Sequence, residues 1–239
     1  MFFFPVISAV TAVYVLAAVL PAVFLMVYIY RHDTVEPEPK GLLLQLIGFG
    51  VLSALGAMVV ESLLTLVLNV LVPADSVLYL PLPAFVVVAA SEEGMKFVLL
   101  RSRTWNHPAF NYRFDGVVYA VFVSLGFAAF ENILYVFSYG LSVALPRALL
   151  SIPGHMSFAV VMGVFYSRAR HHAHYGEEAK CQADLWAAWL VPVLLHGFYD
   201  TCAMSGSTWS TPVFLLFVLV TYTAVFRLIK KESAQDAPV

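Results

Sequence analysis

Charged side chains are scarce in this sequence of 239 residues: Asp, Glu, Lys and Arg make up 12% of it, whereas 61% of the residues are hydrophobic. A soluble domain has about a quarter of its residues charged, so a soluble globular fold is excluded. Intrinsic disorder is excluded as well, because disordered chains combine low hydrophobicity with high charge. The composition is typical of a polytopic membrane protein.

Other absences narrow the range of functions. The two cysteines in the sequence cannot form a disulfide framework. The net charge of −2 and the lack of a long Lys or Arg run argue against a nucleic-acid partner. The sequence has no G-x-S-x-G motif and no H-E-x-x-H motif. It therefore indicates neither a serine nucleophile on a sharp turn nor a zinc-binding helix of the usual spacing.

Long apolar runs are what the sequence has in abundance. A helix that spans the hydrocarbon core needs about 20 largely apolar residues. Seven runs meet this criterion, at roughly residues 2–30, 42–72, 82–100, 116–139, 146–167, 185–204 and 212–229. No Lys or Arg precedes the first run, which is also too long for a signal peptide and is expected to be a retained helix. We predict an all-α integral membrane protein with about seven transmembrane helices in a single domain, residues 1–239.

The cationic side chains predict the orientation of the bundle. All but two of the 13 Lys and Arg residues fall in the first, third and fifth connections or after the last helix. The exceptions are Lys96, inside a predicted helix, and Arg147. Because Lys and Arg concentrate in cytoplasmic loops, we predict an outside N-terminus and a cytoplasmic C-terminus.

Ionisable residues recur inside the predicted spans, where each costs about 2.5 to 3.5 kcal/mol at the helix centre and so indicates a function. The third run contains Glu92, Glu93 and Lys96. Glu92 and Lys96 are four residues apart and share a helix face, where they can pair, whereas Glu93 points about 100° away. The later runs contain Glu131, His155, His196 and Asp200.

These residues agree in depth. With a rise of about 1.5 Å per residue, Glu92, Glu131, His155 and His196 lie roughly 10 to 15 Å from the outer ends of their helices, and Asp200 roughly 5 Å. Four helices therefore place ionisable groups in one layer, which predicts a polar cavity in the outer half of the bilayer. Carboxylates, imidazoles and an ammonium together supply a base, an acid and oxyanion stabilisation, the parts needed for hydrolysis by an activated water.

The same residues form four motifs in order. They are Glu92-Glu93-x-x-Lys96, Phe130-Glu131-x-x-x-Tyr135, His155, and His196-Gly197-x-x-Asp200. This set, which covers residues 92–200, resembles the motifs of the PrsW family of bacterial intramembrane proteases, a relative of the CAAX-prenyl-protease and bacteriocin-processing membrane enzymes.

The resemblance implies an intramembrane endopeptidase of the bacterial inner (plasma) membrane that acts on single-pass membrane proteins. One family member makes the first cut in a membrane-bound anti-sigma factor. The catalytic core would cover about residues 82–204, with flanking helices at 2–30, 42–72 and 212–229. The implied catalytic residues are Glu92, Glu93, His155, His196, Glu131, Lys96 and Asp200. Glu92 would be the base that activates water, with His155 and His196 assisting.

The residues leave alternatives open. No cofactor is required for a glutamate-activated water, but zinc held by His155, His196 and Glu92 is chemically possible. A buried layer of Glu, His and Lys also suits a proton-coupled transporter or channel, or a scaffold whose charges only specify packing. Glu61 belongs to no motif and lies near the same layer, where it would line the cavity or pair with Lys96.

Overall fold

A computed structural model describes residues 9–73 and 75–239. The predicted start of the first span, at residue 2, lies outside the described residues. Within those ranges the chain is helical and contains no β-strand, only an isolated bridge between Tyr112 and Pro238. The predicted all-α class is confirmed.

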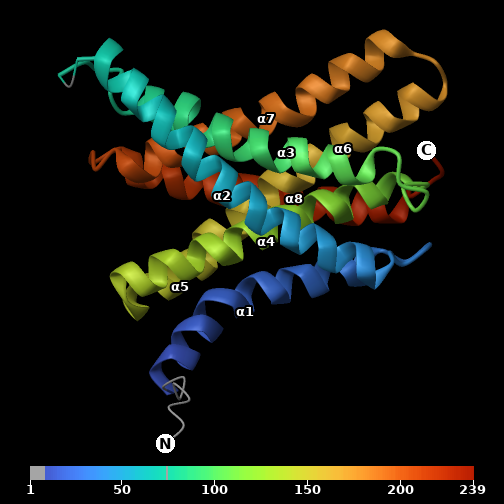
Figure 1. The fold of residues 1–239 in the computed structure, drawn as a ribbon, viewed down its shortest axis with the longest axis horizontal. Coiled ribbons are helices and arrows are strands. Elements are labelled where there is room, and N and C mark those ends of the chain that lie inside the picture. Colours follow the sequence, from blue (N-terminus) through green and yellow to red (C-terminus); the bar gives the residue numbers. More distant parts are fainter. Residues whose placement is uncertain (1–8, 74) are drawn as a thin grey trace, which may run out of the picture.

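Seven long helices form the bundle in Figure 1. They are α1 (Ala9–His32), α2 (Lys40–Leu71), α3 (Ala90–Thr104), α4 (Arg113–Tyr139), α6 (Ile152–His174), α7 (Glu178–Met204) and α8 (Ser210–Ala234). Short segments precede two of them. The π-helix η1 (Pro83–Ala89) leads into α3, and a 3-10 turn η2 (Leu141–Val143), α5 (Ala144–Pro146) and a second π-helix η3 (Arg147–Ser151) lead into α6.

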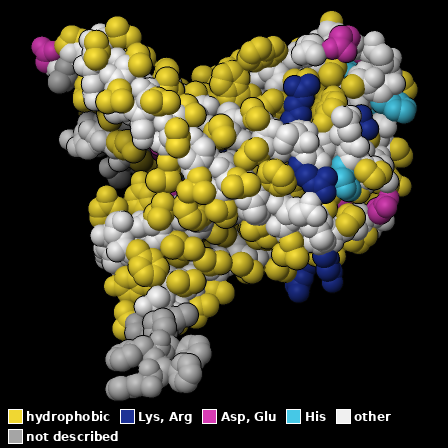
Figure 2. All heavy atoms as spheres, viewed as in Figure 1, with side chains coloured by type: hydrophobic (Ala, Val, Ile, Leu, Met, Phe, Trp, Pro, Cys, Tyr) yellow, Lys and Arg dark blue, Asp and Glu magenta, His cyan; other side chains and the backbone are white. Residues whose placement is uncertain are grey.

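Within the described part of the chain, five helical stretches are long and apolar enough to cross a membrane: residues 9–32, 40–71, 113–139, 141–174 and 210–234. The other two predicted spans, η1–α3 and α7, contain five of the predicted site residues and so are more polar. Figure 2 shows Lys and Arg at the end of the visible face where the C-terminus lies, whereas the opposite end of that face is largely hydrophobic. The count of seven spans and the orientation stay predictions.

Helix α4 lies at the centre of the bundle, and all of its residues from Phe114 to Ala128 are buried. It lies very close to α2 where Gly50 faces Gly126. A Cβ atom at either glycine would overlap the backbone of the other helix, so both positions require glycine. This crossing holds the N-terminal half of α2 against α4, the helix that carries Glu131.

The C-terminal half of α2 diverges from the bundle, as Figure 1 shows. Ala54 and Ala57 are buried against Phe127. After Ala57 no residue of α2 is buried, and apolar side chains such as Leu66 and Val70 are exposed. The divergence separates α2 from α4, α7 and α8 at the end of the molecule where the predicted site lies.

Candidate active site

Two π-helical segments lead directly into the site. Segment η1 ends at Ala89, and Glu92 follows in the first turn of α3. Segment η3 ends at Ser151, and His155 follows in the first turn of α6. π-Helical turns are rare and occur frequently at functional sites, because they alter the direction of the side chains that follow.

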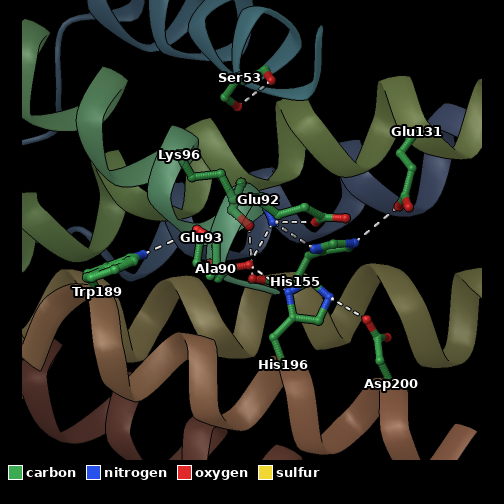
Figure 3. Close-up of polar contacts among 12 residues, drawn as sticks. Ser53, Ala90, Glu92, Glu93, Lys96, Glu131, His155, Trp189, His196 and Asp200 are labelled. Atoms are coloured by element: carbon green, nitrogen blue, oxygen red, sulfur yellow. Dashed lines mark hydrogen bonds and ion pairs between the residues drawn. The ribbon is translucent and has the colours of Figure 1, made fainter. Parts of the chain in front are cut away.

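Lys96 is the centre of the polar network in Figure 3. Its Nζ lies 3.0 Å from Glu92 Oε2, 2.7 Å from Glu93 Oε1 and 3.2 Å from His155 Nδ1. The ammonium also lies 4.0 Å from the centre of the Phe127 ring. The predicted pairing of Glu92 with Lys96 is confirmed. Glu93 differs from Glu92 in that it does not line the cavity, yet the Lys96 side chain reaches between the two carboxylates and pairs with both.

The contacts of His155 define its tautomer. Its Nε2 lies 3.2 Å from Glu131 Oε2, an acceptor, and its Nδ1 faces the Lys96 ammonium, a donor. A neutral ring with the proton on Nε2 satisfies both contacts, since one nitrogen then donates and the other accepts. His155 thus links α6 to α3 and α4.

His196 is in a different electrostatic environment. Its Nδ1 lies 2.9 Å from Glu93 Oε1, and its Nε2 lies 3.4 Å from Asp200 Oδ2. Both ring nitrogens face carboxylates, an arrangement that favours the doubly protonated, cationic ring. Helix α7 approaches η1 closely enough for these contacts because Gly197 lies against the Phe85 ring, where a Cβ atom would clash.

Arg147 completes the network, and sequence reasoning did not find it. Its Nη2 lies 2.6 Å from Glu131 Oε2, its Nε donates to Asn132 Oδ1 at 2.7 Å, and its guanidinium lies over the Tyr135 ring at 3.8 Å. One feature of the sequence could have indicated Arg147: it is the single Lys or Arg residue that the predicted topology places on the outer side. Glu131 is therefore held between an arginine and His155.

A cavity of about 620 Å³ contains much of this network. Its charged and histidine lining residues are Glu61, Glu92, Glu131, Arg147, His155, His196 and Asp200. Glu93 and Lys96 do not line it and are almost completely buried behind Glu92. Exposed apolar side chains of Met58, Leu134 and Met204 also line the cavity, so its mouth includes surface that a membrane would cover. The structure thus brings all seven predicted site residues together.

Sequence comparisons agree with the motif pattern. Residues 38–228 match the family described as PrsW family intramembrane metalloprotease. The chain belongs to the PrsW family. It is 34% identical to Protease PrsW of Geobacillus kaustophilus, with 93% of each chain covered, and 32% identical to that of Oceanobacillus iheyensis, with 89% of this chain and 93% of the relative covered.

A third PrsW relative, Protease PrsW of Bacillus subtilis, is 30% identical, with 92% of this chain and 94% of the relative covered. No solved structure matches the chain. Membership of a family of intramembrane proteases, together with the apolar helices, identifies a multi-pass bacterial membrane protein. Nothing in these comparisons supports the transporter alternative.

The family description raises the question of a metal ion. Ligand atoms of Glu92, Glu93 and His155 lie within 4.8 Å of one another, and they are of types that zinc accepts. This group differs from the set expected from the sequence, since Glu93 replaces His196, whose Nδ1 binds Glu93 instead. The Lys96 ammonium contacts all three residues of the group. The arrangement does not fit a metal ion, because the position between the ligands is held by this cation.

Proposed function

We propose that this chain is an intramembrane endopeptidase in which Glu92 activates the water that attacks the peptide bond. The observation that carries the proposal is the difference between the two adjacent carboxylates. Glu92 lines the cavity and uses one oxygen, Oε2, for Lys96. Glu93 is fully buried and contacts both Lys96 and His196. Of these two carboxylates, only that of Glu92 lies at the cavity surface, where a water and a substrate carbonyl can meet.

The reaction follows from these positions. Glu92 takes a proton from water as the water oxygen bonds to the substrate carbonyl carbon. The carbonyl oxygen gains negative charge, which the cationic His196 in the cavity wall stabilises, while the Lys96 ammonium behind Glu92 adds positive charge to this low-dielectric site. The proton on Glu92 then passes to the amide nitrogen as the C–N bond breaks, so that water is divided between the new carboxylate and the new amine.

The remaining residues position these groups. Glu93 holds the cationic forms of Lys96 and His196, and Asp200 contacts the second nitrogen of His196 through a longer bond of 3.4 Å. Glu131 accepts from His155 and fixes its ring. These roles use only the catalytic set implied by the sequence, and the proposed reaction requires no metal because Lys96 and His196 supply the positive charge.

The substrate class follows from the mouth of the cavity. Met58, Leu134 and Met204 place apolar, exposed surface at its edge, so a chain segment can enter from the lipid along apolar side chains. We infer that the substrate is a single-pass membrane protein cut in the outer half of the bilayer. Cleavage of an anti-sigma factor is one such reaction.

Co-expression with a panel of tagged single-pass membrane proteins tests the proposal. We expect wild type to release a membrane-proximal fragment and Glu92→Gln, which keeps the shape and removes the base, to release at least about 10²-fold less. Glu36→Gln, at a carboxylate outside the cavity, is the matched control and should cleave normally. Full cleavage by Glu92→Gln would overturn the mechanism. Purified enzyme should stay active in a chelator, whereas loss of activity restored by zinc would show a metal-dependent reaction.

A further inference from the structure

Glu61 is the one carboxylate lining the cavity that the proposed reaction does not use. It lies on α2, one turn beyond Ala57, the last buried residue of that helix, and it lines the cavity together with Met58. Its side chain is only partly buried. Of the two expectations from the sequence, the structure supports the first: Glu61 lines the cavity, whereas Lys96 pairs with Glu92 and Glu93.

Glu61 has no partner of its own. Among the described residues it has no hydrogen bond or ion pair, whereas every other charged side chain in the cavity wall has at least one. Glu92 has Lys96, Glu131 has Arg147 and His155, and Asp200 has His196. Ionisable residues in membrane-spanning helices almost always pair with one another or mark the path of a substrate or an ion.

The charge balance of the site indicates what Glu61 would bind. The network and the cavity wall contain five carboxylates: Glu61, Glu92, Glu93, Glu131 and Asp200. Facing them are Lys96, Arg147 and the cationic His196, with His155 neutral. The site thus has two more carboxyl groups than cationic side chains, and the carboxyl group without a local partner is that of Glu61.

We propose that Glu61 is a specificity residue that binds a lysine or arginine side chain of the substrate. This inference rests on the proposed function and names a feature of its substrates. A substrate segment that enters between α2 and the rest of the bundle passes Met58 and Glu61, which lie on the same wall, before it reaches Glu92. A basic residue beside the scissile bond would give Glu61 its missing partner, and its apolar stem would lie against the mouth.

A charge exchange tests the proposal. A reporter that wild type cleaves is made with Lys, Gln or Glu at each position around its cut site. We expect one position at which wild type prefers Lys over Gln by about tenfold or more in kcat/KM, the scale of one charge-assisted hydrogen bond. Glu61→Gln should abolish that preference, and Glu61→Lys should transfer it to the Glu reporter. Glu232→Gln, which makes the same change in net charge on α8 away from the cavity, should keep the wild-type preference.

Binding provides a readout that is independent of cleavage. Fluorescent transmembrane peptides carry Lys or Gln at each of the positions around the cut site. They are titrated into the Glu92→Gln variant of the protein in nanodiscs. The inactive variant should bind the best Lys peptide about tenfold more tightly than its Gln counterpart, and adding Glu61→Gln should remove the difference. Equal affinity for Lys and Gln peptides at every position would overturn the role of Glu61. Failure of every reporter to be cleaved, with the peptide preference intact, would instead count against the proposed function alone.

Discussion

The molecule contains two clusters of largely buried ionisable side chains. The two clusters offset the energetic cost of burying ionisable groups in opposite ways. The site cluster combines carboxylates with Lys96 and with histidines, and it borders a cavity. A second cluster, here called the carboxyl cluster, lies where the α1–α2 connection and the C-terminal tail meet the start of α4. It consists of Asp33, Glu38, Asp115 and Asp236, none of which forms an ion pair with a Lys or Arg.

Hydrogen bonds and protonation offset the cost of burying the carboxyl cluster. Glu38 Oε2 accepts from the Tyr119 hydroxyl at 2.6 Å, and Asp33 Oδ2 accepts from the Glu38 backbone N–H at 3.2 Å. Burial raises the pKa of Asp33 to about 6 and that of Glu38 to about 9, so Glu38 carries a proton at neutral pH. The comparison teaches that a cluster of acids without a cation is accommodated by hydrogen bonds and, at Glu38, by protonation, whereas a cluster that contains both signs of charge keeps its charges available for chemistry.

The largest expected effect is on cleavage activity, which should depend on the site cluster and not on the carboxyl cluster. Glu93→Gln removes the charge that holds Lys96 and His196, and we expect cleavage to fall by about 10²-fold or more, although Glu93 does not line the cavity. Glu38→Gln replaces a neutral acid with a neutral amide and should leave cleavage unchanged. The fragment-release assay measures both. Comparable losses for the two variants would mean that the carboxyl cluster also takes part in the reaction.

The next effect is on stability. Lys96→Met leaves the buried Glu92 without its counter-ion and Glu93 with His196 alone, and we expect the free energy of unfolding to fall by about 3 to 5 kcal/mol. The matched control is Lys180→Met, which breaks an exposed pair with Glu177 and should cost at most about 1 kcal/mol. Thermal unfolding in detergent micelles compares them. If Lys96→Met were as stable as the control, the ammonium would not be the counter-ion of the site.

The site cluster could be predicted from the sequence because its residues obey simple rules. Charges inside apolar runs are conspicuous, and counting residues from the helix ends placed four of them at one depth. The rules fail where the backbone or a long side chain departs from the average. Lys96 reaches both Glu92 and Glu93, which a helical wheel separates, and Arg147 arrives from a π-helical segment that no apolar period indicates.

The carboxyl cluster could not be predicted at all. Glu38 and Tyr119 are 81 residues apart, and Asp236 comes from the end of the chain. In the sequence each of these acids is an ordinary polar residue of a loop, a helix start or a tail. Only the folded arrangement shows that these acids lie together, three of them buried, because their association depends on how the helices pack and not on any local pattern.

A change of pH sharpens the comparison. A carboxyl group whose pKa is raised by folding contributes stability that is complete below its unfolded pKa, about 4.3 for Glu, and is lost as the pH rises through the folded value. For Glu38 this window extends from about 4.3 to about 9. We therefore expect the melting temperature to fall as the pH is raised from 5 to 9.

The matched variants for this titration are Glu38→Gln and Glu36→Gln. The first removes the group with the raised pKa and should flatten the fall of the melting temperature. The second removes a nearby exposed carboxylate and should reproduce the wild-type curve. A melting temperature of wild type that rises over this range would show that the buried acids are ionised in the folded protein.

The smallest expected effect concerns the tail. Asp236 Oδ1 accepts from the backbone N–H of Phe114 at 2.9 Å and thereby satisfies a donor in the first turn of α4 that has no partner within the helix. Asp236→Ala should cost about 1 kcal/mol, whereas Asp236→Asn keeps a side-chain oxygen acceptor and should cost less. Hydrogen exchange at residues 113–116 should accelerate in the alanine variant and remain slow at the site cluster. Faster exchange around Glu92 would show that the two clusters are coupled through α4, and that the carboxyl cluster influences the reaction from the opposite end of the bundle.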